Sequence, residues 1–298
     1  MIQFKRIAVL VFFCVFFSAC SNTPEGEIED IEEVAQQLGD VMASIDEFGG
    51  DAGTFALLTT GASKNICRKE PKSAFDKIGI FFLPKAQAET CAAANTFSSC
   101  SNNSITRDFA GCTVFGALFN GTVAYTFLDA GTDNTCLMAA TGDSIKRQPN
   151  FTVSGRRGAT LTVSATGVNG QVLTKAGAAA YTFSSDGIRR LFTAGGATLF
   201  DFTTATTADI TVTGNNRNNR TLTGGVLRIT NNLTAVTCDF TPSALNWSSS
   251  CNCPTSGSWS ATCSDGKSSS LTISGCGDGS FSLGEETTTV TFDRCQSI

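Results

Sequence analysis

The sequence contains no histidine, and it has only two tryptophans, two tyrosines and three methionines. Without histidine, neither a Ser-His-Asp nor a Cys-His nucleophile system can operate, and no zinc or copper site that uses imidazole can form. Thr, Ser, Gly, Asn and Phe dominate instead. Such a composition favours alternating strands with tight turns over long helices.

An apolar run long enough to cross a bilayer as a helix is also missing from the N-terminal region. The run from Ile7 to Phe17 is much shorter than the roughly 20 residues that a spanning helix needs. Lys5 and Arg6 precede it, and the small residues Ser18 and Ala19 follow it. A positive start, a short apolar core and small residues before a cut are typical of a secretory signal, so we expect residues 1–19 to be removed.

The residues at that cut, Phe17-Ser18-Ala19-Cys20, resemble the lipobox of bacterial lipoproteins, although the family usually has Leu at the position of Phe17. The resemblance implies that Cys20 is lipidated and becomes the first residue, and Ser21 after it implies export to the outer membrane. The protein would then be anchored to that membrane through its N-terminal lipid, facing either side. The alternative is ordinary cleavage after Ala19, which releases a soluble protein.

Basic residues are absent between Cys20 and Ser63, where acidic residues are frequent. Within this arm, residues 20–54, apolar residues recur every three or four positions from Ile28 to Ile45, which predicts one face of a helix. Acidic side chains in its first turns favour the positive end of the helix dipole. We expect the helix to pack on its own body; the same spacing also permits a short coiled coil and an oligomer through residues 28–45.

From about Phe55 onward the pattern has a period of two, as in ATLTVSATG at 159–167. Asn169-Gly170 and Asp186-Gly187 predict hairpin turns. We therefore predict an all-β body, an antiparallel sandwich or a barrel-like fold, after the short acidic N-terminal helix. It would comprise a cysteine-containing β module at 55–145, a basic Thr-rich β module at 146–237 and a second cysteine-rich β module at 238–298.

The cysteines gather in the two outer modules with similar spacings, which indicates a diverged duplication. In an exported chain they predict a disulfide framework, with Cys100–Cys112 and Cys263–Cys276 as the first expected bridges. The number after Cys20 is odd, so one thiol would be left over. The candidates are Cys67, Cys91, Cys100, Cys112, Cys136, Cys238, Cys251, Cys253, Cys263, Cys276 and Cys295.

The middle module is the best sequence candidate for a contact surface, because basic doublets there are interleaved with aromatic residues. A basic surface of this kind favours an anionic glycan or lipopolysaccharide, and we expect no specific nucleic-acid partner. The alternative is that arginines cover the solvent side of strands whose aromatic residues face the core. The candidate ligand-binding residues are Lys146, Arg147, Arg156, Arg157, Arg189 and Arg190.

We expect a structural or adhesive lipoprotein rather than an enzyme, with no cofactor and no metal. One alternative is an exported carbohydrate hydrolase that uses paired carboxylates, for which the candidates are Asp129, Asp133, Asp201 and Asp209. A second is a thiol-based metal or redox protein centred on Cys251 and Cys253, because soft metals favour paired thiolates. Structural disulfides are the expected fate of these two cysteines.

Overall fold

A computed structural model describes residues 25–49, 96–109, 111–114, 117–128, 136–155, 158–292, 294–295 and 297. Several sequence predictions lie outside these residues. They are the signal segment with Cys20, the cysteines Cys67 and Cys91, the basic pair Arg156 and Arg157, and the carboxylates Asp129 and Asp133.

Helix α1 (Glu25–Gly49) confirms the predicted N-terminal helix. From Ile31 to Phe48 its side chains are buried almost all round, the polar Gln36, Gln37 and Asp46 included. A helix with charged and amide groups buried on several sides must meet polar partners on the surrounding strands. The apolar face that a coiled coil would need is therefore covered by the chain's own sheet.

All described strands belong to one connected antiparallel sheet. The first strands are β1 (Thr96–Phe97), β2 (Ser104–Asp108), β3 (Cys112–Val114), β4 (Ala117–Leu128), β5 (Ser144–Ser154), β6 (Thr160–Ala165), β7 (Gln171–Gly177), β8 (Ala180–Ser185) and β9 (Ile188–Ala194). They continue with β10 (Ala197–Ala208), β11 (Ile210–Thr213), β12 (Thr221–Thr223), β13 (Val226–Asn231), β14 (Thr237–Trp247), β15 (Pro254–Cys263), β16 (Ser268–Gly275), β17 (Asp278–Leu283) and β18 (Glu286–Thr291). A short 3-10 helix, η3 (Arg217–Asn219), precedes β12.

The middle of the sheet is built from short strands placed end to end. The second half of β5 pairs with β6 and its first half with β7. Each following rank of the sheet likewise consists of two strands placed end to end: first β8 and β9, then β10 and β11, then β12 and β13. The long strand β14 then pairs with both β12 and β13. The chain thus runs along one rank of the sheet before it turns back into the next rank.

This arrangement corrects the two predicted hairpins. Asn169-Gly170 joins β6 to β7, and Asp186-Gly187 joins β8 to β9. The strands on the two sides of each dipeptide do not pair with each other; instead β6 pairs with β9 and β7 pairs with β8. Both dipeptides lie at interruptions within a rank, and the two interruptions bond to each other: the amide of Asp186 donates to the carbonyl of Gly170. Gly170 and Gly187 have positive φ angles, as the predicted turns require. The predicted pairing of the strands that flank each turn was wrong.

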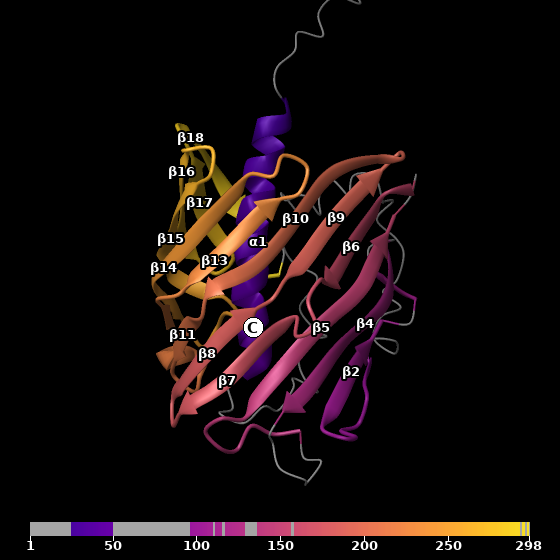
Figure 1. The fold of residues 1–298 in the computed structure, drawn as a ribbon, viewed down its shortest axis with the longest axis vertical. Coiled ribbons are helices and arrows are strands. Elements are labelled where there is room, and N and C mark those ends of the chain that lie inside the picture. Colours follow the sequence, from indigo (N-terminus) through magenta and orange to yellow (C-terminus); the bar gives the residue numbers. More distant parts are fainter. Residues whose placement is uncertain are drawn as a thin grey trace, which may run out of the picture.

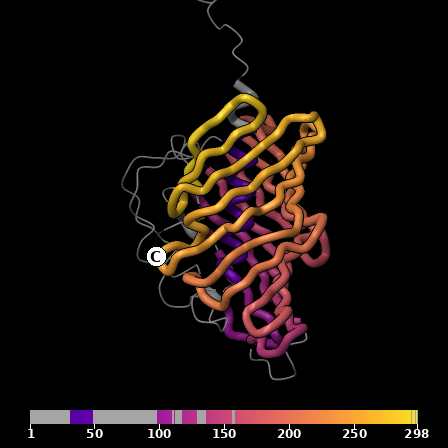
Figure 2. The backbone as a smooth tube through the Cα atoms, turned by 90° about the vertical axis from the view of Figure 1, so that its left-hand side faces the viewer, coloured from indigo at the N-terminus to yellow at the C-terminus, as the bar shows by residue number. Residues whose placement is uncertain are grey.

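The sheet curves around α1, so that the helix lies inside its concave face (Figure 1 and Figure 2). Gln36 bonds to β18 on one side, and Gln37 accepts from Thr204 of β10 on another. Two predicted module boundaries fall inside strands, since 145/146 lies in β5 and 237/238 lies in β14. The described parts of the three predicted β modules therefore share one sheet and one core.

Four disulfides join described residues: Cys100–Cys136, Cys238–Cys263, Cys251–Cys276 and Cys253–Cys295. They confirm the disulfide framework and indicate an extracellular or periplasmic protein. The two bridges expected first were wrong. Cys263 ends β15 whereas Cys276 follows the end of β16, so the hairpin places them at its opposite ends. The bonds also differ between the two cysteine-rich regions, because Cys100 pairs downstream and Cys263 pairs upstream.

Candidate functional site

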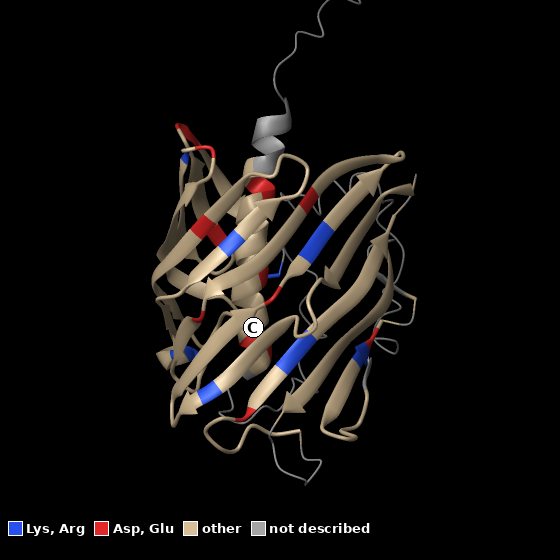
Figure 3. Cartoon of the chain, in the orientation of Figure 1, with Lys and Arg blue, Asp and Glu red and all other residues tan. Residues whose placement is uncertain are grey.

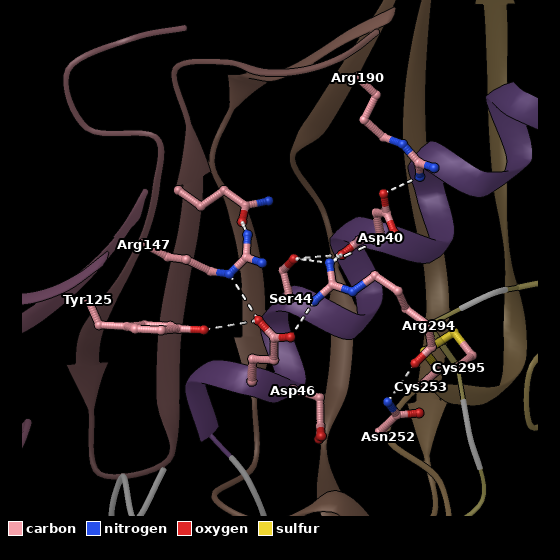
Figure 4. A network of polar contacts seen from close by, with 12 residues as sticks. Asp40, Ser44, Asp46, Tyr125, Arg147, Arg190, Asn252, Cys253, Arg294 and Cys295 are labelled. Carbon is pink, nitrogen blue, oxygen red and sulfur yellow. Dashed lines mark hydrogen bonds and ion pairs between the residues drawn. A yellow bond between two sulfur atoms is a disulfide. The ribbon is translucent and has the colours of Figure 1, made fainter. Parts of the chain in front are cut away.

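The most distinctive cluster of charged groups lies between α1 and the sheet. Three carboxylates in the last turns of the helix, those of Asp40, Asp46 and Glu47, each meet at least one arginine from elsewhere in the chain. We call these groups the helix ion-pair network, and Figure 4 shows the part of it around Asp40, Arg147 and Arg294. The arginines come from β5, β9, η3, the residue before β12 and the residues after β18; they are Arg147, Arg190, Arg217, Arg220 and Arg294.

Asp46 is the most deeply buried carboxylate of the network. Arg217 donates to it through two parallel bonds, from Nε to Oδ1 at 2.9 Å and from Nη2 to Oδ2 at 2.8 Å. Arg220 donates to Oδ1 as well. All three side chains are 3% exposed. Bidentate geometry between a planar guanidinium and a carboxylate is the strong form of ion pair, and here it is shielded from water.

Glu47 is bound from three sides. Arg147 Nε donates to Oε2 at 2.9 Å, Tyr125 donates its hydroxyl to the same oxygen at 3.3 Å, and Arg294 donates to Oε1. Burial alone would raise the pKa of Glu47, but the charges of Arg294, Arg147 and Arg107 together lower it to about 2. Glu47 therefore stays ionised.

The electrostatics around Glu47 also fix its partners. Burial and the negative charge of Glu47 raise the pKa of Tyr125, so this phenol keeps its proton. Burial would lower the pKa of Arg294, but Glu47 and Asp40 outweigh it and raise it. Gln171 accepts a bond from Arg147 at 2.8 Å and fixes the direction of that guanidinium.

Asp40 completes the network one to two turns earlier in the helix. Arg190 of β9 donates to Asp40 Oδ2, and Arg294 lies 3.8 Å from Oδ1. Arg294 also donates to Ser44 Oγ at 3.1 Å. Its backbone is held because Asn252 donates to its carbonyl and the next residue, Cys295, is bonded to Cys253. The network thus connects the helix to the C-terminal end of the sheet.

Chemically, the helix ion-pair network is suited to holding the helix rather than to catalysis. A general acid or base needs a pKa near the working pH, whereas Glu47 has a pKa of about 2 and is saturated with donors. Of the carboxylates proposed for a hydrolase, Asp201 is bonded to Arg189 and Asn232, which lower its pKa. Asp209 follows it by eight residues, roughly 26 Å along an extended chain, far beyond the separation of a glycosidase pair.

The structure divides the predicted basic residues between the two faces of the sheet. Arg147 and Arg190 point inward, with side chains 6% and 5% exposed, and belong to the helix ion-pair network. Their neighbours Lys146 and Arg189 point the other way because successive strand residues alternate, and Arg189 is bound to Asp201. A surface made by all four is therefore not formed. Sequence reasoning missed Arg217, Arg220 and Arg294. The signal that could have found them is the acidic arm without basic residues, because its carboxylates need partners from the rest of the chain.

The outer face of β14–β18 carries two rows of hydroxyl groups. The first row is Thr241, Ser260, Ser270, Ser282 and Thr287, and the second is Ser243, Ser258, Thr272, Ser280 and Thr289. Members of a row are direct cross-strand partners, so they repeat about every 4.8 Å, and the rows are two residues, roughly 7 Å, apart. We call these residues the hydroxyl face. Charged side chains are sparse on the described strands (Figure 3).

Residues that alternate with those of the hydroxyl face, or lie directly beside them in the strand, point inward and fill the core. They include Phe240, Trp259, Leu271, Phe281 and Val290, each at most 3% exposed. The alternation of large apolar and small hydroxyl side chains therefore produces a dry inner face and an outer face rich in hydroxyl groups on the same strands, where Asp239 and Asp278 are also exposed.

No helix in the described part of the chain has the length and apolarity to cross a membrane. Among the same residues, no group of three or more histidine, cysteine or acidic side chains is placed to hold a metal ion. Cys251 and Cys253, the proposed thiolate pair, are bonded to Cys276 and Cys295.

Comparisons of the chain with protein families, with curated proteins and with solved structures gave no match.

Proposed function

We propose that this protein is a lipid-anchored lipoprotein of the bacterial outer membrane with a structural or adhesive role, and that the hydroxyl face is its contact surface. The disulfides support an oxidising compartment, and the lipobox-like residues before Cys20 support the anchor. The concave side of the sheet is largely filled by α1 and its ion pairs, which leaves the outer side for contact with an extended polymer.

The register of β14–β18 is the observation that carries this proposal. Five adjacent strands place uncharged hydroxyls in register, each able to donate and to accept a hydrogen bond. A repeating partner with its own hydroxyl groups, such as a neutral polysaccharide, would match such a surface along its length. Each contact would be weak, so binding depends on many contacts made together.

An anionic glycan is the weaker partner for this surface. Arg147 and Arg190 are committed to the helix, and Arg189 is bound to Asp201, so few of the predicted basic residues that the structure describes remain available to an anion. Binding through hydroxyl groups should also persist when salt is added, whereas binding through exposed arginines should weaken.

The test is binding of the full chain to immobilised neutral and anionic polysaccharides at low and high salt. We expect binding to a neutral polymer that is unchanged by salt. The variant Thr241→Val, Ser260→Ala, Thr287→Val should lose most of it, since these exposed positions in the first row lose only their hydroxyls. The matched control is Thr211→Val, Thr223→Val, which removes paired outward hydroxyls on β11 and β12.

Two outcomes would contradict the contact surface. One is salt-sensitive binding to anionic polymers alone, lost in Arg189→Gln. The other is equal loss in the triple variant and in its control. The anchor is tested separately by membrane fractionation, where Cys20→Ala should release the protein into the soluble fraction.

A further inference from the structure

A cavity of about 660 Å³ opens between the N-terminal half of α1 and the sheet. Its wall is mostly apolar, with Asn231 and Thr234 as polar members. The apolar part is formed by Ile31, Val34, Phe202, Ile229, Val236 and Leu283, together with the disulfide Cys238–Cys263. This volume lies within the usual range for small-molecule sites, which are mostly apolar with a few polar groups at the edge. The cavity lies on the inner side of the sheet, so it is separate from the hydroxyl face.

The rim of the cavity has an excess of negative charge. It is formed partly by the turns after β15 and β17 and by the first residue of β18, which contribute Asp265, Lys267, Glu285 and Glu286. The three carboxylates are exposed and face one lysine. An anionic head group at this opening would meet like charges, and a cationic one would meet opposite charges.

We propose that this cavity binds an amphiphile with an apolar tail and a positively charged head group. The tail occupies the space between α1 and the wall formed by β10, β13, β14 and β17, where it displaces water from apolar surface. The head group remains at the rim beside Asp265, Glu285 and Glu286, where it keeps part of its hydration. The binding site does not depend on the polysaccharide contact or on the lipid anchor.

The test is calorimetry on the full chain with two probes that share a tail, dodecyltrimethylammonium and dodecyl sulfate, each below the concentration at which it forms micelles. We expect the cationic probe to bind at least about tenfold more tightly, because charge complementarity at the rim separates the two. Asp265→Asn, Glu285→Gln, Glu286→Gln, which changes only exposed side chains, should remove this preference while leaving the tail site in place.

A second variant tests the cavity itself. Val236→Trp places an indole in the space and should abolish binding of the cationic probe, whereas Thr211→Trp, on the outer face of β11, should leave it unchanged. Equal affinity for the two probes, or native binding by Val236→Trp, would overturn the proposal. Binding seen only after residues 20–24 are deleted would also overturn it, since the chain's own N-terminal segment would then be the occupant.

Discussion

Arg217 donates two parallel hydrogen bonds to Asp46, although 171 positions separate them in the sequence. Asp46 lies in the last turns of α1, and Arg217 begins η3 at the far end of the middle module. The pair forms only when the helix is inside the curved sheet. The helix is therefore an integral part of the core, and its charged groups select one depth and one rotation for it, because such a placement is needed to bring Asp40, Asp46 and Glu47 to their arginines.

Replacing Asp46 tests this role most directly. Asp46→Asn leaves the charges of Arg217 and Arg220 buried without a counter-ion, which should lower the free energy of unfolding by about 3–5 kcal/mol. Asp239→Asn is the matched control, since Asp239 pairs with Arg228 in the same bidentate geometry but both side chains are at least 40% exposed. It should cost less than about 1 kcal/mol. Urea unfolding measures the loss of unfolding free energy in both variants. Equal losses would show that the buried pair stabilises the fold no more than the exposed pair does.

Acid should weaken the protein through Glu47. Folding lowers the pKa of Glu47 from 4.5 to about 2, so its ion pairs stabilise the fold fully above about pH 5 and are lost as the pH falls toward 2. Asp201 and Asp239, whose pKa values Arg189 and Arg228 lower, act in the same direction. Glu47→Gln should be less stable than the native chain near neutral pH, by about 2–3 kcal/mol, and the gap should close on acidification. A gap that stays constant down to about pH 2 would show that Glu47 acts through packing alone.

In the part of the chain that the structure describes, the sequence was sufficient for the type of secondary structure, because its two hydrophobic periods are local properties. The period of three to four from Ile28 to Ile45 predicted α1, and the alternation in ATLTVSATG predicted β6. The alternation also implies that the two members of each basic doublet lie on opposite faces of the sheet, since adjacent residues on a strand face opposite sides. Which member of each doublet faces inward depends on register with the rest of the sheet, and the pair Arg189-Arg190 does not reveal it by itself.

The remaining errors concern contacts between distant residues. Asn169-Gly170 has the same local chemistry whether the chain folds back or continues along its rank. The dipeptide therefore predicted a turn, but it did not reveal that β6 and β7 both pair with β5. Cysteine spacing likewise did not determine the bonds, because Cys238 and Cys263 become neighbours only when β14 and β15 are in register. The network around Glu47 has the same origin, since Arg147 lies in β5 and Arg294 follows β18.

The disulfide Cys253–Cys295 should be coupled to the helix through Arg294. Cys295 follows Arg294 directly, and Arg294 contacts Glu47. Replacing both cysteines with serine should cost about 2–5 kcal/mol, and it should also reduce the cost of Glu47→Gln by about 0.5–3 kcal/mol, because Arg294 is then held less firmly.

A double-mutant cycle in urea measures this coupling. The control is Cys238→Ser, Cys263→Ser, which removes a bridge beside Ile31 and Val34 near the other end of the helix and should leave the cost of Glu47→Gln unchanged. Additive losses with both cysteine pairs would show that the bridge does not position Arg294. Peptide mapping without reduction should first recover the four bonded pairs.

Gly39 should respond to alanine with the opposite sign from most helix glycines. In an exposed helix the change to alanine stabilises by about 0.5–1 kcal/mol, because glycine loses more backbone entropy on folding. At Gly39 an added Cβ would lie 2.6 Å from Cδ1 and 3.1 Å from Cβ of Phe292. Phe292 follows β18 and is buried, so it cannot move away into solvent.

Overpacking of this kind costs about 1–3 kcal/mol and outweighs the helix propensity, so Gly39→Ala should be destabilised in thermal and urea unfolding. Phe292→Leu tests the cause, because a smaller side chain makes room for the methyl group. In the Phe292→Leu background, Gly39→Ala should cost less than in the native chain or should stabilise. A stabilising Gly39→Ala in the native background would mean that the sheet does not hold α1 at the closeness that its contact with Phe292 requires.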